Sequence, residues 1–474
     1  MIRVYLDWNI ISKLKTPEFT EIKAFFTENR DKISFPFSPA HFEDISKSDS
    51  PNNAKLMEDI TTMDALCQSN HMSYDKDLDI AAPYIATPSQ YYTEYKSDTV
   101  SIDTVTSPSY LASLLADIDN PLVVSIINHL LDTPISFPKW DMPITNPVYD
   151  IFVNLQNVST IRELIYEAMS IIHRVTTDKE TYKAFRSVID PKLLGQIQGP
   201  ASCIVPALDQ ILMQVGSPMG FMDMVKSIQQ KKDNGNRMSL FTTAYILLDM
   251  LYKHDKLPKK GNNATNVITD AMHAYYGAFC DYFVTDDRKL ADKARVLYHE
   301  FNINIPIITS KELITTLSPI LCSYNDAIEK IIDDIIHATR IDCRDDKYDV
   351  CDDECETSWV VSFDKYYFNF FNHAHVIIGK GEYENKIIIQ LYRRFKGSSH
   401  YVFYSEVDQL LNLLSDLLGN IPKAQRDAIK YCTENGCFTW VSTDKTITIH
   451  IREDEHYKGR PELNFILDLT NNNS

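Results

Sequence analysis

The chain has 474 residues, a length that corresponds to about three domains, or to two domains with a large insertion. Hydrophobic residues make up 44% of the chain and charged residues 24%, values that are typical of globular proteins and exclude disordered, collagen-like and membrane-embedded classes. The formal net charge is −18, so the surface as a whole cannot bind a polyanion through positive charge. Any contact with nucleic acid would need a local basic patch.

The cysteines and the N-terminus indicate the cellular compartment. Nine cysteines are scattered without the regular spacing of a disulfide framework, which favours a reducing environment. Asp7 interrupts the first apolar run too early for the core of a signal peptide. The longest apolar stretch, Pro121–Leu131, is far shorter than the ~20 residues of a membrane-spanning helix. We therefore expect a soluble, cytoplasmic protein that does not bind membranes.

The first 47 residues alternate between strand and helix patterns. The apolar run Ile2–Leu6 predicts a buried strand that ends at Asp7. Asn9 can cap the helix that follows, and Ile33–Phe37 predicts a further short strand or turn. The next helix carries Glu43.

Residues 48–261 have a different pattern. Apolar residues recur at helical spacing in Leu111–Leu131, Val158–Arg174 and Ser239–Tyr252. Proline-containing breaks between these segments mark loops rather than a domain linker. This part of the chain is predicted to be a mainly helical insertion.

Strand and helix patterns resume at Asn266. A helix that carries Asp270 precedes the apolar strand Tyr282–Val284, which is followed by the polar residues Thr285–Asp287. The run Ile305–Ile308 predicts a last strand before another helix. Alternation of this kind favours a parallel sheet that is covered on both faces.

The C-terminal part is predicted to be a separate domain. Residues 340–356 are rich in Asp and Glu and poor in apolar residues, which indicates an exposed acidic linker. Residues 357–474 predict an α+β domain with an antiparallel sheet. Its expected strands are Trp359–Phe371, His375–Ile378, Lys386–Tyr392 and Lys445–Ile451. Its expected helices are Val407–Leu418 and Lys423–Cys432.

Four acidic residues stand at the ends of elements in the two strand-helix segments. These candidate catalytic and metal-binding residues are Asp7, Glu43, Asp270 and Asp287. Because ligands bind beyond the carboxyl ends of parallel strands, we expect them in one crevice. Crowded carboxylates repel one another unless a cation neutralises them, and oxygen ligands favour Mg²⁺ or Mn²⁺. Such ions promote phosphodiester hydrolysis.

Four segments carry a resemblance to a known family. They read VYLDWNIIS around Asp7, FSPAHFEDI around Glu43, DAMHAYYGAFCDYFVTDDRKL from Asp270 onward, and IPIITSKELI. In this order they resemble the PIN domain, a fold of metal-dependent nucleases. Asp7 and Asn9 match the strand-terminal Asp and the Asn that follows two residues later in that family.

The resemblance implies both a fold and a reaction. The fold would be a three-layer α/β/α core with a parallel sheet, formed by residues 1–47 and 262–330 and interrupted by the helical insertion. The four carboxylates would bind Mg²⁺ or Mn²⁺, and a bound water would attack the phosphodiester of a nucleic acid, RNA in preference to DNA. The products would end in 5′-phosphate and 3′-hydroxyl. Trp8 departs from the family pattern, which usually has a small residue or Thr at this position.

Other residues near the four carboxylates are supporting candidates. Asp281 and Asp286 are further candidate metal ligands, because the sequence does not define which acid at this strand end faces the site. Asn9 and Thr285 are expected to orient the neighbouring carboxylates. His273, three residues after Asp270, either contacts the scissile phosphate or packs as an ordinary histidine. For each acid, a role as a helix cap or turn residue remains the alternative.

Two further clusters have weaker signals. Lys231, Lys232, Lys259 and Lys260 belong to a basic stretch that would bind phosphates if it folded over the crevice, and would otherwise be a solvated surface. Cys343, Cys351 and Cys355 lack the paired spacing of a zinc site.

The sequence therefore predicts a metal-dependent nuclease, with two alternatives. One is a non-catalytic nucleic-acid-binding or sensor protein on the same scaffold, and the other is a metal-dependent phosphatase. The insertion and the C-terminal domain suggest that activity is gated, as in a toxin-like or phage-defence effector. A regulatory partner or a second copy of the chain would then bind one of these parts.

Overall fold

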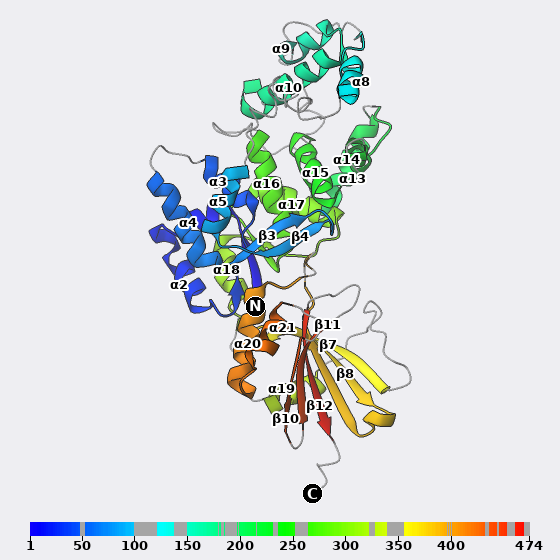
Figure 1. Ribbon diagram of the computed structural model, residues 1–474. Coiled ribbons are helices and arrows are strands. Elements are labelled where there is room, and N and C mark those ends of the chain that lie inside the picture. The colour runs from blue at the N-terminus through cyan, green and yellow to red at the C-terminus, as the bar shows by residue number, and fades with distance from the viewer. Residues whose placement is uncertain are drawn as a thin grey trace. The chain divides into compact units, whose positions relative to one another are not determined.

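The computed structural model divides into two compact units (Figure 1). The first unit consists of Met1–Tyr91, Tyr276–Asp287 and Asn302–Ser474, and the second of Tyr92–Tyr275 and Arg288–Phe301. The described residues are 1–47, 53–98, 121–136, 149–178, 180–181, 184, 197, 199–214, 216–230, 236–251, 264–321, 328–338, 355–395, 397, 399, 401–431, 436–442, 445–452 and 460–468.

A small parallel sheet lies in the first unit. Its strands are β1 (Ile2–Leu6), β2 (Ile33–Ser34), β5 (Tyr282–Val284) and β6 (Ile307–Ile308), in the order β2-β1-β5-β6. Every residue of the two central strands β1 and β5 is buried, as expected for a parallel sheet without a solvated face. The expected parallel sheet is confirmed, and its strands come from the segments before and after the predicted insertion.

A β-hairpin follows helices α3 (Pro39–Lys47) and α4 (Asn53–Cys67), within the segment expected to be helical. Strands β3 (Asn70–Asp75) and β4 (Ile80–Ile85) pair in antiparallel fashion. Their turn forms because the Asp75 side chain accepts hydrogen bonds from the backbone N–H groups of Asp77 and Leu78, at 2.9 and 3.1 Å. The first unit therefore continues to Tyr91, well beyond the expected boundary at residue 47.

The second unit is helical over its described residues. Its helices include α8 (Pro121–Leu131), α9 (Tyr149–Phe152), α10 (Ile161–Thr177), α13 (Ala201–Gln214), α14 (Phe221–Gln230), α15 (Arg237–Leu251) and α17 (Arg288–Glu300). A buried ion pair joins two of them, with Lys293 Nζ 2.7 Å from Asp249 Oδ1. Helix α16 (Ala264–Gly277) begins in this unit, and its last residues belong to the first. In the described part of the chain, no helix is both long and apolar enough to cross a membrane.

The C-terminal part of the first unit contains the expected antiparallel sheet. Its strands are β7 (Cys355–Tyr367), β8 (Phe371–Gly379), β9 (Lys386–Tyr392), β10 (Cys437–Val441), β11 (Lys445–Arg452) and β12 (Arg460–Asp468), in the order β10-β11-β12-β9-β8-β7. The single strand expected over Trp359–Phe371 is wrong, because Phe368 and Asn369 have φ values of +51° and +54° that turn the chain between β7 and β8.

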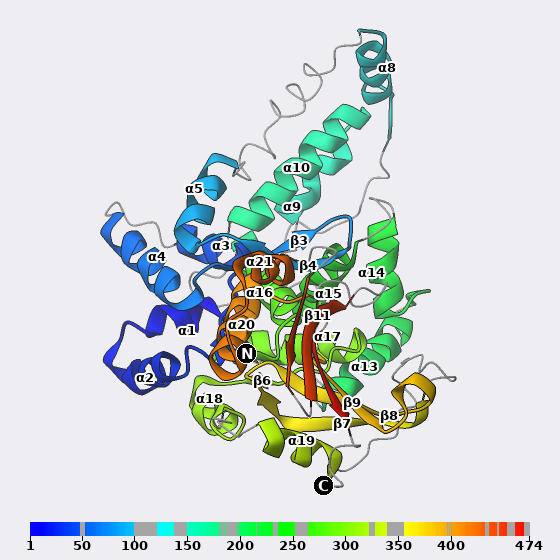
Figure 2. The same ribbon diagram turned by 60° about the horizontal axis from the view of Figure 1, so that its bottom comes forward.

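Helices cover one face of this sheet. They are α19 (Ile328–Ile336), α20 (Tyr404–Leu418) and α21 (Lys423–Lys430), and Figures 1 and 2 both show α20 and α21 beside the strands. Alternate strand residues such as Val376, Ile389 and Phe465 form one buried core with Leu411 and Leu414 of α20. This period of two explains why one face of the sheet is apolar.

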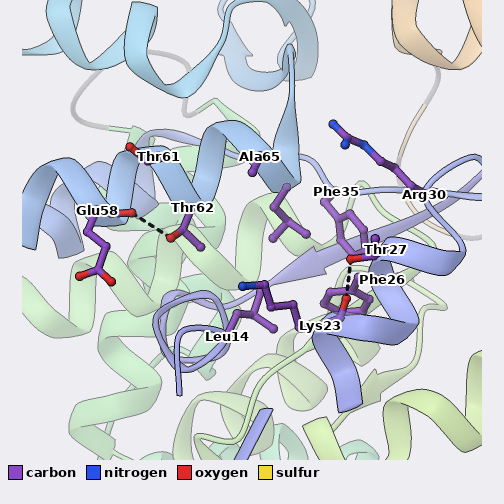
Figure 3. Close-up of a pocket in the computed structure, with 11 residues that line it drawn as sticks. Leu14, Lys23, Phe26, Thr27, Arg30, Phe35, Glu58, Thr61, Thr62 and Ala65 are labelled. Carbon is purple, nitrogen blue, oxygen red and sulfur yellow. Dashed lines mark hydrogen bonds between the residues drawn. The ribbon is translucent and has the colours of Figure 1, made fainter. Parts of the chain in front are cut away.

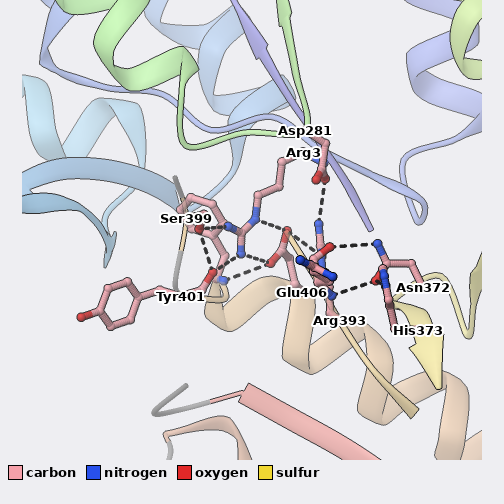
Figure 4. A network of polar contacts seen from close by, with 10 residues as sticks. Arg3, Asp281, Asn372, His373, Arg393, Ser399, Tyr401 and Glu406 are labelled. Atoms are coloured by element: carbon pink, nitrogen blue, oxygen red, sulfur yellow. Dashed lines mark hydrogen bonds and ion pairs between the residues drawn. The ribbon is translucent and has the colours of Figure 1, made fainter. Parts of the chain in front are cut away.

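A buried polar network connects the two sheets of the first unit (Figure 4). Arg3, in β1, donates hydrogen bonds from Nε and Nη2 to the two carboxylate oxygens of Glu406 in α20, at 2.9 and 2.7 Å. Arg393, which follows β9, forms an ion pair with Asp281 at 2.9 Å and has its Nη1 3.6 Å from Glu406. Each of these four residues is at most 2% exposed.

The network holds Glu406 in its charged form. Burial alone would raise the pKa of this carboxyl group, but the guanidinium groups of Arg3 and Arg393 outweigh burial and lower the pKa from 4.5 to about 2. The Phe395 ring packs against both cations, with ring centroids 4.4 Å from the Cζ of Arg3 and 4.7 Å from that of Arg393. The charged residues are therefore both paired and stacked.

Glu406→Gln is expected to lower the free energy of unfolding at pH 7 by about 3–5 kcal/mol, because it leaves two buried cations without their shared partner. A depressed folded-state pKa stabilises the protein above the unfolded-state pKa, near 4.5, and this contribution is lost as the pH falls toward 2. The difference in the free energy of unfolding between wild type and variant, measured by urea titration, should therefore narrow as the pH falls over this range. Glu28→Gln, at the exposed end of helix α2 (Thr20–Glu28), serves as the control. A difference in unfolding free energy that does not change with pH would contradict the stabilising role of the Glu406 charge.

Candidate metal centre

Asp7 lies at the carboxyl end of β1, directly before helix α1 (Trp8–Lys13). Although it occupies the N-cap position of that helix, its side chain makes no capping hydrogen bond. Instead, Asp7 Oδ2 accepts hydrogen bonds from Thr285 Oγ1 at 2.9 Å and from Asn9 Nδ2 at 3.2 Å. The residue is only 2% exposed. Its carboxylate is therefore buried and oriented by these two side chains, and does not cap the helix.

The second carboxylate comes from helix α3. Ala40, Phe42 and Ile45 are at most 1% exposed and hold this helix against the core of the first unit. Asp44, between two of these residues, is half-buried. A short apolar helix surface thus brings an acidic side chain to the end of the parallel sheet.

The third side chain is His273, on α16. This helix runs without interruption into the first unit, where it ends at Gly277, shortly before β5 begins at Tyr282. Asp7, Asp44 and His273 each offer one ligand atom, and these three atoms lie within 4.8 Å of one another. His273 is fully buried. The group therefore combines two carboxylates and one imidazole.

The geometry and chemistry of this group fit a divalent metal ion. Ligands on opposite sides of a small divalent ion, each at about 2.0–2.2 Å, lie roughly 4.2 Å apart, and adjacent ligands lie closer. The limit of 4.8 Å among the three atoms is wider than this spacing, so a bound ion would draw the ligand atoms closer together. Carboxylate oxygens suit Mg²⁺ and Mn²⁺, while an imidazole nitrogen adds a preference for transition metals.

Three of the sequence-predicted acids lie next to this group without belonging to it. Glu43 precedes Asp44 on α3, and Asp270 lies one turn before His273 on α16. The backbone N–H of Asp287 donates to Thr285 Oγ1 at 3.0 Å. The same hydroxyl group donates to Asp7, so it connects this carboxylate to the loop after β5. The predicted supporting residues Asn9 and Thr285 are therefore in direct contact with Asp7.

Asp286 and Asp281 are engaged elsewhere. Asp286 accepts hydrogen bonds from the backbone N–H and the hydroxyl of Ser310, at 2.9 and 2.8 Å, and pairs with Lys13 at 2.9 Å. Burial would raise its pKa, but these hydrogen bonds lower it below its usual value. Asp281 precedes β5, at the opposite end of the strand from Thr285, and its carboxylate is neutralised by Arg393. Both acids therefore have structural partners in place of a metal.

The remaining candidates fall outside the described residues. These are the basic residues Lys231, Lys232, Lys259 and Lys260, the cysteines Cys343 and Cys351 with the side chain of Cys355, and nearly all of the acidic linker.

Asp44 is the candidate ligand that sequence reasoning missed. The signal was the helical spacing: Asp44 lies one turn after Ala40 and His41, which are both buried, whereas Glu43 lies one turn after half-buried Pro39 and buried Ala40. Adjacent acids on a helix point about 100° apart, so only one of them can face the strand end.

A separate pocket of about 460 Å³ lies between α2 and α4 (Figure 3). Apolar side chains such as Leu14, Phe26 and Phe35 line it, together with Lys23 from α2 and Arg30 from the turn after this helix. None of the three clustered ligands lines this pocket. It is therefore not part of the candidate metal centre.

Comparisons with known proteins assign no family. No family model matches the chain, and no curated protein or solved structure matches it either. The interpretation of the site therefore depends on its own geometry and on the resemblance of its motifs.

Thr285→Val is expected to destabilise the protein by about 1–3 kcal/mol, because it removes the hydroxyl group that donates to buried Asp7 and accepts from Asp287. Thr285→Ser keeps this hydroxyl group and should retain most of the stability. Urea unfolding at neutral pH compares the two variants. A larger loss of stability in Thr285→Ser than in Thr285→Val would mean that the methyl group, rather than the hydrogen bonds, stabilises this strand end.

Proposed function

We propose that the protein is a metal-dependent nuclease that hydrolyses phosphodiester bonds, with RNA preferred over DNA as substrate. The observation that carries the proposal is the convergence of Asp7, Asp44 and His273 within 4.8 Å at the carboxyl end of a parallel strand. Ligands of α/β proteins bind at this edge of a sheet. The preference for RNA and the PIN-like nature of the core follow from the motif resemblance.

The three side chains have distinct roles in this proposal. A bound Mn²⁺ or Mg²⁺ would supply an activated water and stabilise charge on the phosphoryl oxygens. Asp7, held by the Thr285 hydroxyl and the Asn9 amide, provides an oriented carboxylate oxygen. Asp44, which is half-buried, provides the ligand on the more accessible side. His273 contributes a neutral nitrogen ligand, so the group carries less negative charge than an all-carboxylate set.

Asp7→Asn is expected to abolish Mn²⁺-dependent cleavage of labelled RNA while the protein stays folded, because the amide keeps the shape of the side chain but loses its charge. Cleavage is followed on denaturing gels, and folding by circular dichroism. The matched control is Asp286→Asn, which changes an acid that bonds Ser310 and Lys13. This control should keep its activity and lose only about 0.5–2 kcal/mol of stability.

The same assay separates the alternatives. A non-catalytic binding protein would retain RNA without cleaving it in Mn²⁺, and a phosphatase would hydrolyse nitrophenyl phosphate but leave RNA intact. Full RNA cleavage by Asp7→Asn would remove this carboxylate from the mechanism. Equal loss in the Asp7 and Asp286 variants would point to unfolding in place of a lost ligand.

The imidazole ligand predicts a metal preference. Mn²⁺ should bind at least about tenfold more tightly than Mg²⁺, because imidazole nitrogen favours transition metals over Mg²⁺. His273→Asn replaces this nitrogen donor with an amide and should narrow the ratio, chiefly by weakening Mn²⁺ binding. Isothermal titration with each metal measures both affinities. The control is His299→Asn, at an exposed histidine in α17, and a ratio that is unchanged in His273→Asn would exclude the imidazole as a ligand.

A further inference from the structure

We propose that His41 is a positioning residue that sets the spacing between Asp7 and Asp44, an inference that rests on the proposed metal site. His41 lies on α3, one turn before Asp44, and is fully buried. Its imidazole forms a hydrogen bond with the backbone carbonyl oxygen of Leu6, the residue immediately before Asp7. One side chain thus joins the two elements that carry the carboxylates.

The hydrogen bonds of His41 define its tautomer. The backbone N–H of Ser38 donates to His41 Nδ1 at 3.1 Å, so this nitrogen carries no proton. His41 Nε2 therefore carries the proton and donates it to the Leu6 carbonyl oxygen at 2.9 Å. A neutral imidazole satisfies both bonds at once. The first bond closes the start of α3, and the second attaches that helix to the end of β1.

The surrounding contacts leave α3 little freedom to shift. The Tyr5 hydroxyl and Ser38 Oγ are 2.6 Å apart, and the Tyr5 ring lies 5.1 Å from the His41 ring. The backbone of Phe37, the residue before Ser38, forms a parallel bridge with β3: its N–H donates to the Asn70 carbonyl oxygen, and its carbonyl oxygen accepts from the Met72 N–H. The N-terminus of α3 is therefore attached to two strands, and the His41 side chain together with the Tyr5–Ser38 pair connects it to β1.

This arrangement explains how a half-buried acid is kept beside a buried one. The carboxylates of Asp44 and Asp7 repel each other when they are close together, and a metal ion relieves this repulsion only once it is bound. Rigid attachment of α3 through Leu6 holds the pair together before binding. The backbone carbonyl of Leu6 and the carboxylate of Asp7 belong to adjacent residues, so a change in one bond is transmitted directly to the ligand.

The experiment measures Mn²⁺ affinity of the full chain by isothermal titration, alongside the melting temperature without metal. His41→Phe keeps the ring and removes both bonds, and it should weaken Mn²⁺ binding about 10–100-fold. His41→Gln can place its amide N–H near the position of Nε2 and reach Leu6, so it should bind Mn²⁺ within a few-fold of wild type. His41→Asn reaches only toward Ser38 and should bind as weakly as the Phe variant.

Controls separate positioning from stability. His375→Phe makes the same change at a buried histidine of β8, in the antiparallel sheet, and should leave Mn²⁺ affinity unchanged. If it weakens binding as much as His41→Phe, general destabilisation explains the effect and the inference is overturned. If His41→Phe does not fold, the Gln and Asn variants decide, and equal affinity in these two overturns the inference.

The outcome also distinguishes this inference from the proposed function. Wild-type binding of Mn²⁺ that is lost in Asp7→Asn establishes the site independently of His41. With that result, normal affinity in His41→Phe and His41→Asn overturns only the positioning role. Absence of any Asp7-dependent Mn²⁺ binding overturns the proposed function, and the positioning role with it.

Discussion

The first unit depends on a set of charges buried between its two sheets. Arg3, Arg393, Asp281 and Glu406 are almost completely removed from water, and such charges are tolerated only when each is paired. Glu406 accepts from one guanidinium group and lies close to the other, so the C-terminal helix α20 is attached to β1. Removal of one member of this network would leave its partners as uncompensated charges in the interior.

The same short strand connects this network to the candidate metal centre. Arg3 and Asp7 are four residues apart, near the two ends of β1, and every residue of the strand is buried. An extended strand with neighbours on both sides has little freedom to slide, because a shift of one residue would move every side chain to the opposite face. The antiparallel sheet and its helices therefore help to fix the position of Asp7 through the backbone of β1.

Much of the local structure could be predicted from the sequence. The runs Ile2–Leu6, Tyr282–Val284 and Lys386–Tyr392 coincide with strands, because continuous apolar and β-branched residues have few other stable conformations when flanked by polar ones. The β3–β4 hairpin was missed, since its turn has Asp and Lys in place of Gly or Pro. Its decisive feature is a side-chain hydrogen bond from Asp75, which periodicity does not report.

The candidate site shows the same division between local pattern and long-range contact. The sequence alone determined that an acidic residue follows β1 and that the helices α3 and α16 each carry acidic residues, because strand ends and helical spacing are local properties. Only the tertiary structure decided that Asp44 and His273 meet Asp7, while Asp281 pairs with Arg393. The physical reason is that neighbouring acids on a helix point in different directions, and opposite ends of a strand face different partners. Which of them lie close enough to share a ligand depends on contacts between residues that are far apart in the chain.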